Sequence, residues 1–141
     1  MFVTLIVGIL DLETGILKLC NAGHNPPILI YPDGQVSYLE FKTQIFVGVV
    51  EDFKYSDEEV VLEKESKLFL YTDGVTEAEN INKELYGEEK LLEMLSDNAS
   101  SDVRTTVNVV VDSIASHVKE AEASDDLTFL LIQYEPGTAN S

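Results

Sequence analysis

The stretch LFLYTDGVTEAEN, from Leu68 to Asn80, decides how this chain is organised. Its first part, LFLY, is apolar at successive positions, which indicates a central strand covered on both faces. The apolar run stops at Thr72, and an acid-rich segment begins at once with Asp73. A second stretch, SDDLTFLLI from Ser124 to Ile132, has the same parts in reverse order, so its carboxylates lead into a strand. We therefore expect acidic side chains at the ends of two strands.

Short strands separated by tight turns fill the first half of the chain. Residues 1–30 alternate apolar runs with turn signals, of which DLETG is one, and PDGQ at 32–35 is a strong turn. Two further strands are expected at 59–62 and 67–72. This spacing is typical of an antiparallel meander.

The pattern changes to a helical period after the acid-rich segment. GEEKLLEML places leucines on one face, and 98–120 repeats valine and isoleucine at helical spacing, with Ser101 or Asp102 as the N-cap. The last element, LTFLLIQY, is a strand. Strands followed by two helices and a returning strand predict an α+β fold, with helices on one face of an antiparallel sheet. The doubly covered LFLY strand places a second sheet behind the first.

Composition narrows the class of protein. The chain has 141 residues, a hydrophobic fraction of 45% and a formal net charge of −17. Such a charge argues against nucleic acid and anionic membranes as partners, because both repel a polyanion. No apolar run is long enough to cross a bilayer, and the N-terminus lacks the basic region of a signal peptide. The sequence thus predicts a cytoplasmic protein.

The acidic residues at the strand ends are candidate ligands for a metal ion. Asp73 with Glu77, and Asp125 with Asp126, supply the carboxylate oxygens that Mg²⁺ and Mn²⁺ prefer. Gly74 removes a side chain, so that water or substrate could approach the carboxylate. The alternative is that these residues form a turn and a helix cap. No Ser/His/Asp or Cys/His nucleophilic set stands out, which leaves no catalytic residue beyond the metal ligands.

His24 lies in NAGHNPP, between amide side chains and two prolines. In this context the histidine either orders a loop through hydrogen bonds or takes part in a site, and the sequence leaves both readings open.

Four segments together resemble a known family. MFVTLIVGILDLETGILKLCNAGHNPPILI, LFLYTDGVTEAEN, LYGEEKLLEML and SDDLTFLLI are similar to the SpoIIE/RsbU-type bacterial branch of the metal-dependent, protein-phosphatase-2C-like phosphatases. The resemblance implies an antiparallel β-sandwich flanked by helices, formed by residues 1–135, with 136–141 as a disordered tail. It implies a serine/threonine protein phosphatase that uses two Mn²⁺ or Mg²⁺ ions. Its substrate would be a phosphorylated anti-sigma-factor antagonist, in the control of an alternative sigma factor.

The resemblance also assigns roles to individual residues. Asp73 of TDG and Asp125 of DDLT match metal ligands, and Glu77 matches a position that helps to hold an additional metal. Asp126 stands where many relatives have asparagine. The resemblance therefore assigns Asp126, like Gly74, a position next to the metal ligands and not the role of a direct ligand. His24 is common in the bacterial branch, with an open role.

One feature of the family is missing from the sequence. Members carry an early D-V-x-G-x-G motif that supplies the aspartate bridging the two metals, and this chain has none. The resemblance therefore predicts an N-terminally truncated domain whose metal binding is weakened or absent. Missing strands would leave sheet edges uncovered, which predicts a homodimer through those edges.

Two further functions stay open beside the phosphatase. The first is a catalytically inactive phosphatase-like fragment or module that binds a regulatory protein, which the missing aspartate favours. The second is an unrelated acidic β-rich binding protein, which the order of three motifs disfavours.

Overall fold

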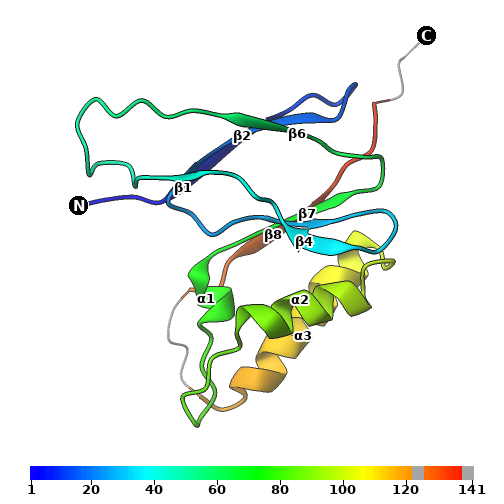
Figure 1. Cartoon of the computed structure of the whole chain (residues 1–141). Coiled ribbons are helices and arrows are strands. Elements are labelled where there is room, and N and C mark those ends of the chain that lie inside the picture. The colour runs from blue at the N-terminus through cyan, green and yellow to red at the C-terminus, as the bar shows by residue number, and fades with distance from the viewer. Residues whose placement is uncertain (122–125, 138–141) are drawn as a thin grey trace.

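Two four-stranded sheets and a layer of helices make up the chain, and the computed structural model describes residues 1–121 and 126–137 (Figure 1). The first sheet contains β1 (Leu5–Leu10), β2 (Ile16–Ala22), β5 (Thr43–Gln44) and β6 (Glu58–Val61). The second sheet has the order β4-β3-β7-β8, formed by β3 (Ile28–Ile30), β4 (Val36–Tyr38), β7 (Lys67–Tyr71) and β8 (Phe129–Gln133). The helices are α1 (Asp73–Thr76), α2 (Glu88–Asp97) and α3 (Val103–Val118).

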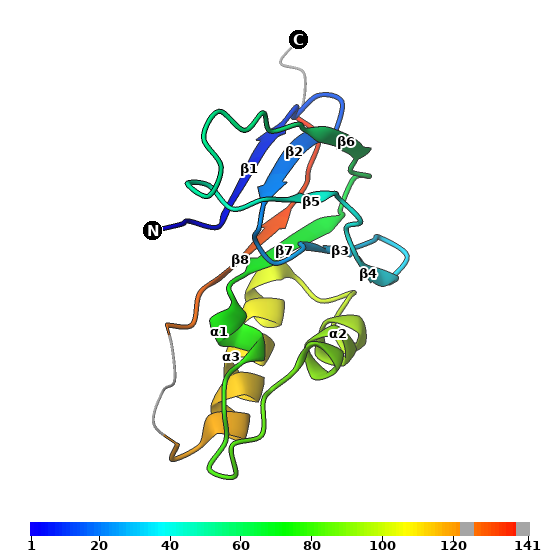
Figure 2. The ribbon, with the colours of Figure 1, turned by 60° about the vertical axis from the view of Figure 1, so that its left-hand side comes forward.

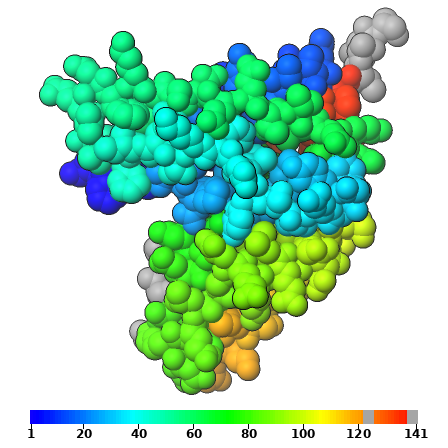
Figure 3. All heavy atoms as spheres, viewed as in Figure 1, coloured from blue at the N-terminus to red at the C-terminus, as the bar shows by residue number. Residues whose placement is uncertain are grey.

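The second sheet is the middle layer of the molecule. Helices α2 and α3 cover one of its faces and the first sheet lies behind the other, so the helices form a block below the sheets in the space-filling view (Figure 3). Along β7, Phe69 and Tyr71 pack into the helix-side core, whereas Leu68 packs into the core between the sheets. The predicted α+β sandwich with a doubly covered central strand is therefore confirmed.

The predicted antiparallel meander is wrong in one respect. Strands β1 and β2 form an antiparallel hairpin in the first sheet, but β3 and β4 form theirs in the second. The chain changes sheet in the loop between Ala22 and Ile28, where Gly23 adopts a φ of 78°. In addition, β5 pairs with β2 in parallel.

Helix α3 confirms the helical reading of the valine-rich segment. It begins after Asp102, whose carboxylate accepts a hydrogen bond from the Thr105 backbone N–H at 2.8 Å. This N-cap satisfies one of the backbone donors that the first turn leaves without a helical partner. Val110 and Ile114 are buried in the helix-side core.

Two further findings complete the fold. No helix in 1–121 and 126–137 is long and apolar enough to span a membrane. At the C-terminal side, the backbone N–H of Gly137 donates to the carbonyl of Leu12 at 3.0 Å, and the remainder of the predicted tail, 138–141, lies outside the described residues.

Candidate metal and phosphate site

The end of β7 carries the first part of the site. Strand β7 pairs with β8 up to Tyr71 opposite Phe129, and the contact continues one residue further. The Thr72 backbone N–H donates to the carbonyl of Thr128 at 3.0 Å, and the Thr72 hydroxyl reaches the same carbonyl at 3.3 Å. Helix α1 then begins at Asp73 (Figure 2). The segment leading into β8 therefore runs beside the corner at which β7 ends.

Gly74 brings the two acidic corners into contact. It is buried, and a Cβ built on it would lie 2.3 Å from the Asp126 carbonyl oxygen and 3.6 Å from the Leu127 Cα. Only glycine allows the two backbones to approach this closely. The expectation that the missing side chain admits water or substrate is therefore wrong, because the Asp126 backbone occupies that space. The absent side chain instead joins the corner after β7 to the corner before β8.

Two carboxylates project from the one-turn helix α1. Asp73 opens the helix and Glu77 closes it, with the Glu77 backbone N–H donating to the Asp73 carbonyl at 2.8 Å. Both side chains are exposed, and residues four apart lie on the same side of a helix. Asp126 is also exposed. Asp125, the other predicted ligand, lies outside the described residues.

His24 belongs to a loop ordered by hydrogen bonds. The buried Asn21 side chain accepts from the His24 backbone N–H at 2.7 Å and donates to the His24 carbonyl at 2.9 Å. The His24 Nδ1 lies 3.1 Å from the carbonyl of Asn25, to which it donates when it carries the proton. The loop-ordering interpretation of this residue is thus visible in the structure.

The same histidine lines a small cavity beside the acidic corner. The cavity has a volume of about 120 Å³ and eight lining residues, four of them apolar: Ile6, Leu70, Phe129 and Leu130, with His24, Tyr71, Thr72 and Thr128. Burial raises the pKa of the Tyr71 phenol well above its ordinary value, with Tyr38 beside it contributing. Tyr71 therefore stays protonated at physiological pH and cannot act as a general base there.

The two threonines are the site residues that sequence reasoning missed. Thr72 and Thr128 each border an acidic motif, TDG and DDLT, and the structure pairs them across the strands. Each threonine stands where the acidic motif meets the apolar residues of the strand, and this position is the sequence feature that could have identified it.

The type of ligand at the corner fits a hard divalent cation, but the number of ligands is small. Asp73, Glu77 and Asp126 offer only carboxylate oxygens, which suit Mg²⁺ or Mn²⁺ rather than Zn²⁺. In the described part of the chain, no group of three or more His, Cys, Asp or Glu side chains is arranged to hold a metal ion. An ion at this corner would therefore keep several of its waters.

Comparison with known proteins identifies a family. The family model described as stage II sporulation protein E (SpoIIE) matches residues 1–135. Protein IcfG of Synechocystis is 29% identical over 94% of this chain, and phosphoserine phosphatase RsbP of Bacillus subtilis is 29% identical over 87%. The chain spans only 20% of IcfG and 28% of RsbP.

Solved structures share the fold. The RsbU and RsbW domains of Rv1364c from Mycobacterium tuberculosis superpose with a TM-score of 0.74 at 25% identity, over 96% of this chain and 37% of that one. The Mn-presoaked phosphatase domain of SpoIIE from Bacillus subtilis superposes with a TM-score of 0.70 at 16% identity, over 96% of this chain and 58% of that one. The fold is therefore that of these phosphatase domains, and the chain spans part of each.

Proposed function

Because the chain belongs to the stage II sporulation protein E (SpoIIE) family, we propose that it is a serine/threonine protein phosphatase domain that hydrolyses phosphoserine with the help of Mn²⁺ or Mg²⁺. RsbP, which matches most of this chain, is a phosphoserine phosphatase. We further propose that the substrate is a phosphorylated anti-sigma-factor antagonist, which the protein would meet in the cytoplasm. The contact between Gly74 and the Asp126 backbone is the observation that supports the proposal most, because it joins the TDG and DDLT corners.

The residues of the corner have distinct parts in this proposal. Asp73 and Asp125 would hold the cation, with Glu77 within the same turn of helix α1 to support it. Gly74, Asp126 and the Thr72–Thr128 hydrogen bond would keep the two corners together. When bound, a divalent cation polarises phosphoryl oxygens and makes a water molecule more acidic.

The proposed place of the phosphoryl group is the acidic corner itself, on the side of this cavity where Thr72 and Thr128 lie, because four of the eight residues that line the cavity are apolar. The carboxylates alone would repel a phosphate dianion, so binding at this position requires a cation between them. Catalysis should therefore depend strictly on the metal.

Phosphate release tests the proposal. A phosphoserine-containing protein of the antagonist type is incubated with the chain and about 1 to 10 mM Mn²⁺, a concentration around the millimolar affinity expected of an open carboxylate site. We expect release that EDTA abolishes and that Asp73→Asn lowers at least about 100-fold, since the variant loses a ligand. Asp112→Asn, on the exposed face of α3, is the matched control and should keep full activity. Equal activity of Asp73→Asn and the parent would contradict the assignment.

A second function has its own support. In the described residues, no group of three or more His, Cys, Asp or Glu side chains is arranged to hold a metal ion. This observation favours a phosphatase-like module that binds a regulatory protein without turnover. Calorimetric titration with Mn²⁺ separates the two functions: a folded chain that takes up no Mn²⁺ supports the binding module, and uptake that Asp73→Asn removes supports the phosphatase.

A further inference from the structure

One nitrogen of the His24 ring faces a partner that can only accept a hydrogen bond. Its Nδ1 lies 3.1 Å from the backbone carbonyl oxygen of Asn25. A carbonyl oxygen has no proton to give, so an unprotonated Nδ1 at this distance would set two lone pairs against each other. Nδ1 therefore carries the proton, and in the neutral ring Nε2 keeps its lone pair.

The backbone that carries this ring is fixed by a buried amide. Asn21, in β2, has an exposed fraction of only 1%. Its side chain accepts from the His24 backbone N–H at 2.7 Å and donates to the His24 carbonyl at 2.9 Å. Both backbone groups of His24 are thus held by one residue of the core, which keeps the ring on its Asn25 partner.

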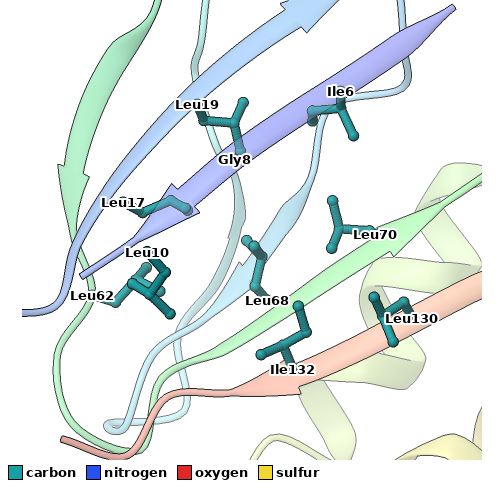
Figure 4. A pocket seen from close by; sticks show the side chains of 10 residues that line it. All are labelled: Ile6, Gly8, Leu10, Leu17, Leu19, Leu62, Leu68, Leu70, Leu130 and Ile132. Atoms are coloured by element: carbon teal, nitrogen blue, oxygen red, sulfur yellow. The ribbon is translucent and has the colours of Figure 1, made fainter. Parts of the chain in front are cut away.

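The cavity beside the acidic corner offers little to the other ring nitrogen on its apolar side. Ile6, Leu70 and Leu130 line it from β1, β7 and β8, and Figure 4 shows these three side chains reaching into the space between the sheets. Hydrocarbon side chains cannot donate a hydrogen bond. In the described part of the chain, the ring of His24 makes its hydrogen bond through Nδ1 alone. A donor for Nε2 must therefore come from the polar end of the cavity.

The polar end of the cavity adjoins the acidic corner. Thr72 and Thr128 line it there, and Asp73 follows Thr72 directly. The Thr72 hydroxyl donates to the Thr128 carbonyl at 3.3 Å, so its proton is already used. The cavity volume of about 120 Å³ leaves room for water, since one molecule takes about 30 Å³ in the liquid. Water at this end could donate to Nε2.

We propose that His24 is held as the Nδ1–H tautomer and that its Nε2 accepts a hydrogen bond from a water molecule at the polar end of the cavity, which it orients for attack on the phosphoserine. A water that donates to Nε2 turns the lone pairs of its oxygen away from the ring, toward the corner at which the phosphoryl group is proposed to bind. The tautomer follows from the hydrogen bonds alone, whereas the use of this water in hydrolysis rests on the proposed phosphatase function.

The second of the two histidines in the chain is an internal reference, because its partners impose the opposite tautomer. His117 Nε2 lies 3.0 Å from the backbone carbonyl of Glu84, which can only accept. Its Nδ1 lies 3.4 Å from the Lys90 ammonium, which can only donate. The proton of the neutral His117 ring is therefore on Nε2.

Two-bond ¹H–¹⁵N correlation spectra of the imidazole rings test the tautomer. The chain is studied with EDTA at about pH 8, at the upper end of the range in which histidine changes its charge. We expect a protonated Nδ1 and an unprotonated Nε2 for His24, and the reverse for His117. A His24 ring with its proton on Nε2, or an even mixture of the two tautomers, overturns the proposal whether or not the chain is a phosphatase.

Two substitutions separate the acceptor role from a loop-ordering role. In His24→Asn the side-chain amide takes the place of Nδ1 and still donates to the Asn25 carbonyl, but no acceptor stands where Nε2 was. In His24→Gln the longer side chain brings an amide oxygen to the place of Nε2. In the phosphate-release assay we expect His24→Asn to lower kcat about 10- to 100-fold, and His24→Gln to retain at least about 10 times more kcat than His24→Asn.

The order of the two variants decides between the roles. A histidine that only orders the loop predicts the reverse order, because His24→Asn keeps the hydrogen bond to the Asn25 carbonyl. Equal kcat values for the two variants, or a higher value for His24→Asn, overturn the proposal. A parent chain that releases no phosphate overturns the proposed function and this use of the water together, and the spectra then decide the tautomer on their own.

Discussion

Replacing Gly74 by alanine tests the contact on which the site depends. The added Cβ would lie 2.3 Å from the Asp126 carbonyl oxygen, whereas ordinary contacts begin at 3.4 Å. The shortfall of about 1 Å must come from movement of backbone, because no flexible side chain is involved. That movement strains the Thr72–Thr128 hydrogen bonds, which lie beside the contact.

The expected cost follows from two opposing effects. Forcing an extra carbon into a packed position costs about 1–3 kcal/mol, while alanine gains up to about 1 kcal/mol over glycine in a helix. Because the obstacle is a backbone oxygen only 2.3 Å away, the upper part of that range, about 2–3 kcal/mol, applies, and the net loss is about 1–2 kcal/mol. Such a loss lowers the Tm of a domain of this size by roughly 3–8 °C. Helix propensity alone predicts the opposite sign, so the direction of the change is itself informative.

Thermal unfolding followed by circular dichroism measures the effect, with Gly137→Ala as the control. Gly137 has as its nearest neighbour only the Leu12 carbonyl oxygen, 3.9 Å from the built Cβ, and that variant should stay within about 1 °C of the parent. If Gly74→Ala unfolds at the same temperature as the parent or higher, the two acidic corners do not pack as described.

Three further predictions concern the helical layer. The buried Lys67 ammonium donates hydrogen bonds to the carbonyls of Ala99 and Ser101. Lys67→Met leaves both carbonyls unpaired and should therefore lower the free energy of unfolding, measured by urea titration, by about 1–3 kcal/mol. Tyr86→Phe should cost about 1 kcal/mol by removing a 2.8 Å hydrogen bond between the Tyr86 and Ser113 hydroxyls, and adding Ser113→Ala should cost little more. Hydrogen bonds from the Thr105 backbone and side chain lower the pKa of Asp102 below 3.8, so its contribution to stability is present above that pH and is lost as the pH falls through the folded-state pKa. Asp102→Asn, which can still cap the helix, should therefore flatten the fall in Tm between pH 5 and about pH 2, and an unchanged profile would contradict this origin.

The sequence predicted those elements whose residues carry a period. The apolar run around Phe69 indicated a doubly covered strand because both faces of β7 are buried, and the valines of α3 recur at helical spacing over several turns. Helix α1 has only four residues, too few for a period to appear. Strand β5 has two residues and depends on the Gln44 side chain, which bonds both backbone groups of Ser56, so no hydrophobic pattern marks it.

The contact at the candidate site was predicted in part. Asp73 and Gly74 were singled out because an acidic residue and a glycine follow a strand directly, and the structure brings Gly74 against the Asp126 backbone from a segment more than fifty residues away. The packing role of Gly74 was not predictable. Alternation of residues along a strand shows which side chains are buried, but it does not show which distant backbone segment will pack against a given residue. For the same reason the transfer of the chain from one sheet to the other after Ala22 escaped the sequence patterns.

The central claim is that the TDG and DDLT corners together bind a divalent cation, and Mn²⁺ titration observed by ¹H–¹⁵N NMR tests it most directly. Paramagnetic Mn²⁺ broadens the amide signals of nearby residues whether or not the chain is catalytically active. We expect substoichiometric Mn²⁺ first to remove the signals of Asp73, Gly74, Asp126 and Leu127, and Asp73→Asn to prevent this. Broadening that begins elsewhere, such as at Glu88 and Glu89 of α2, or that spreads evenly over this acidic chain, would contradict the claim.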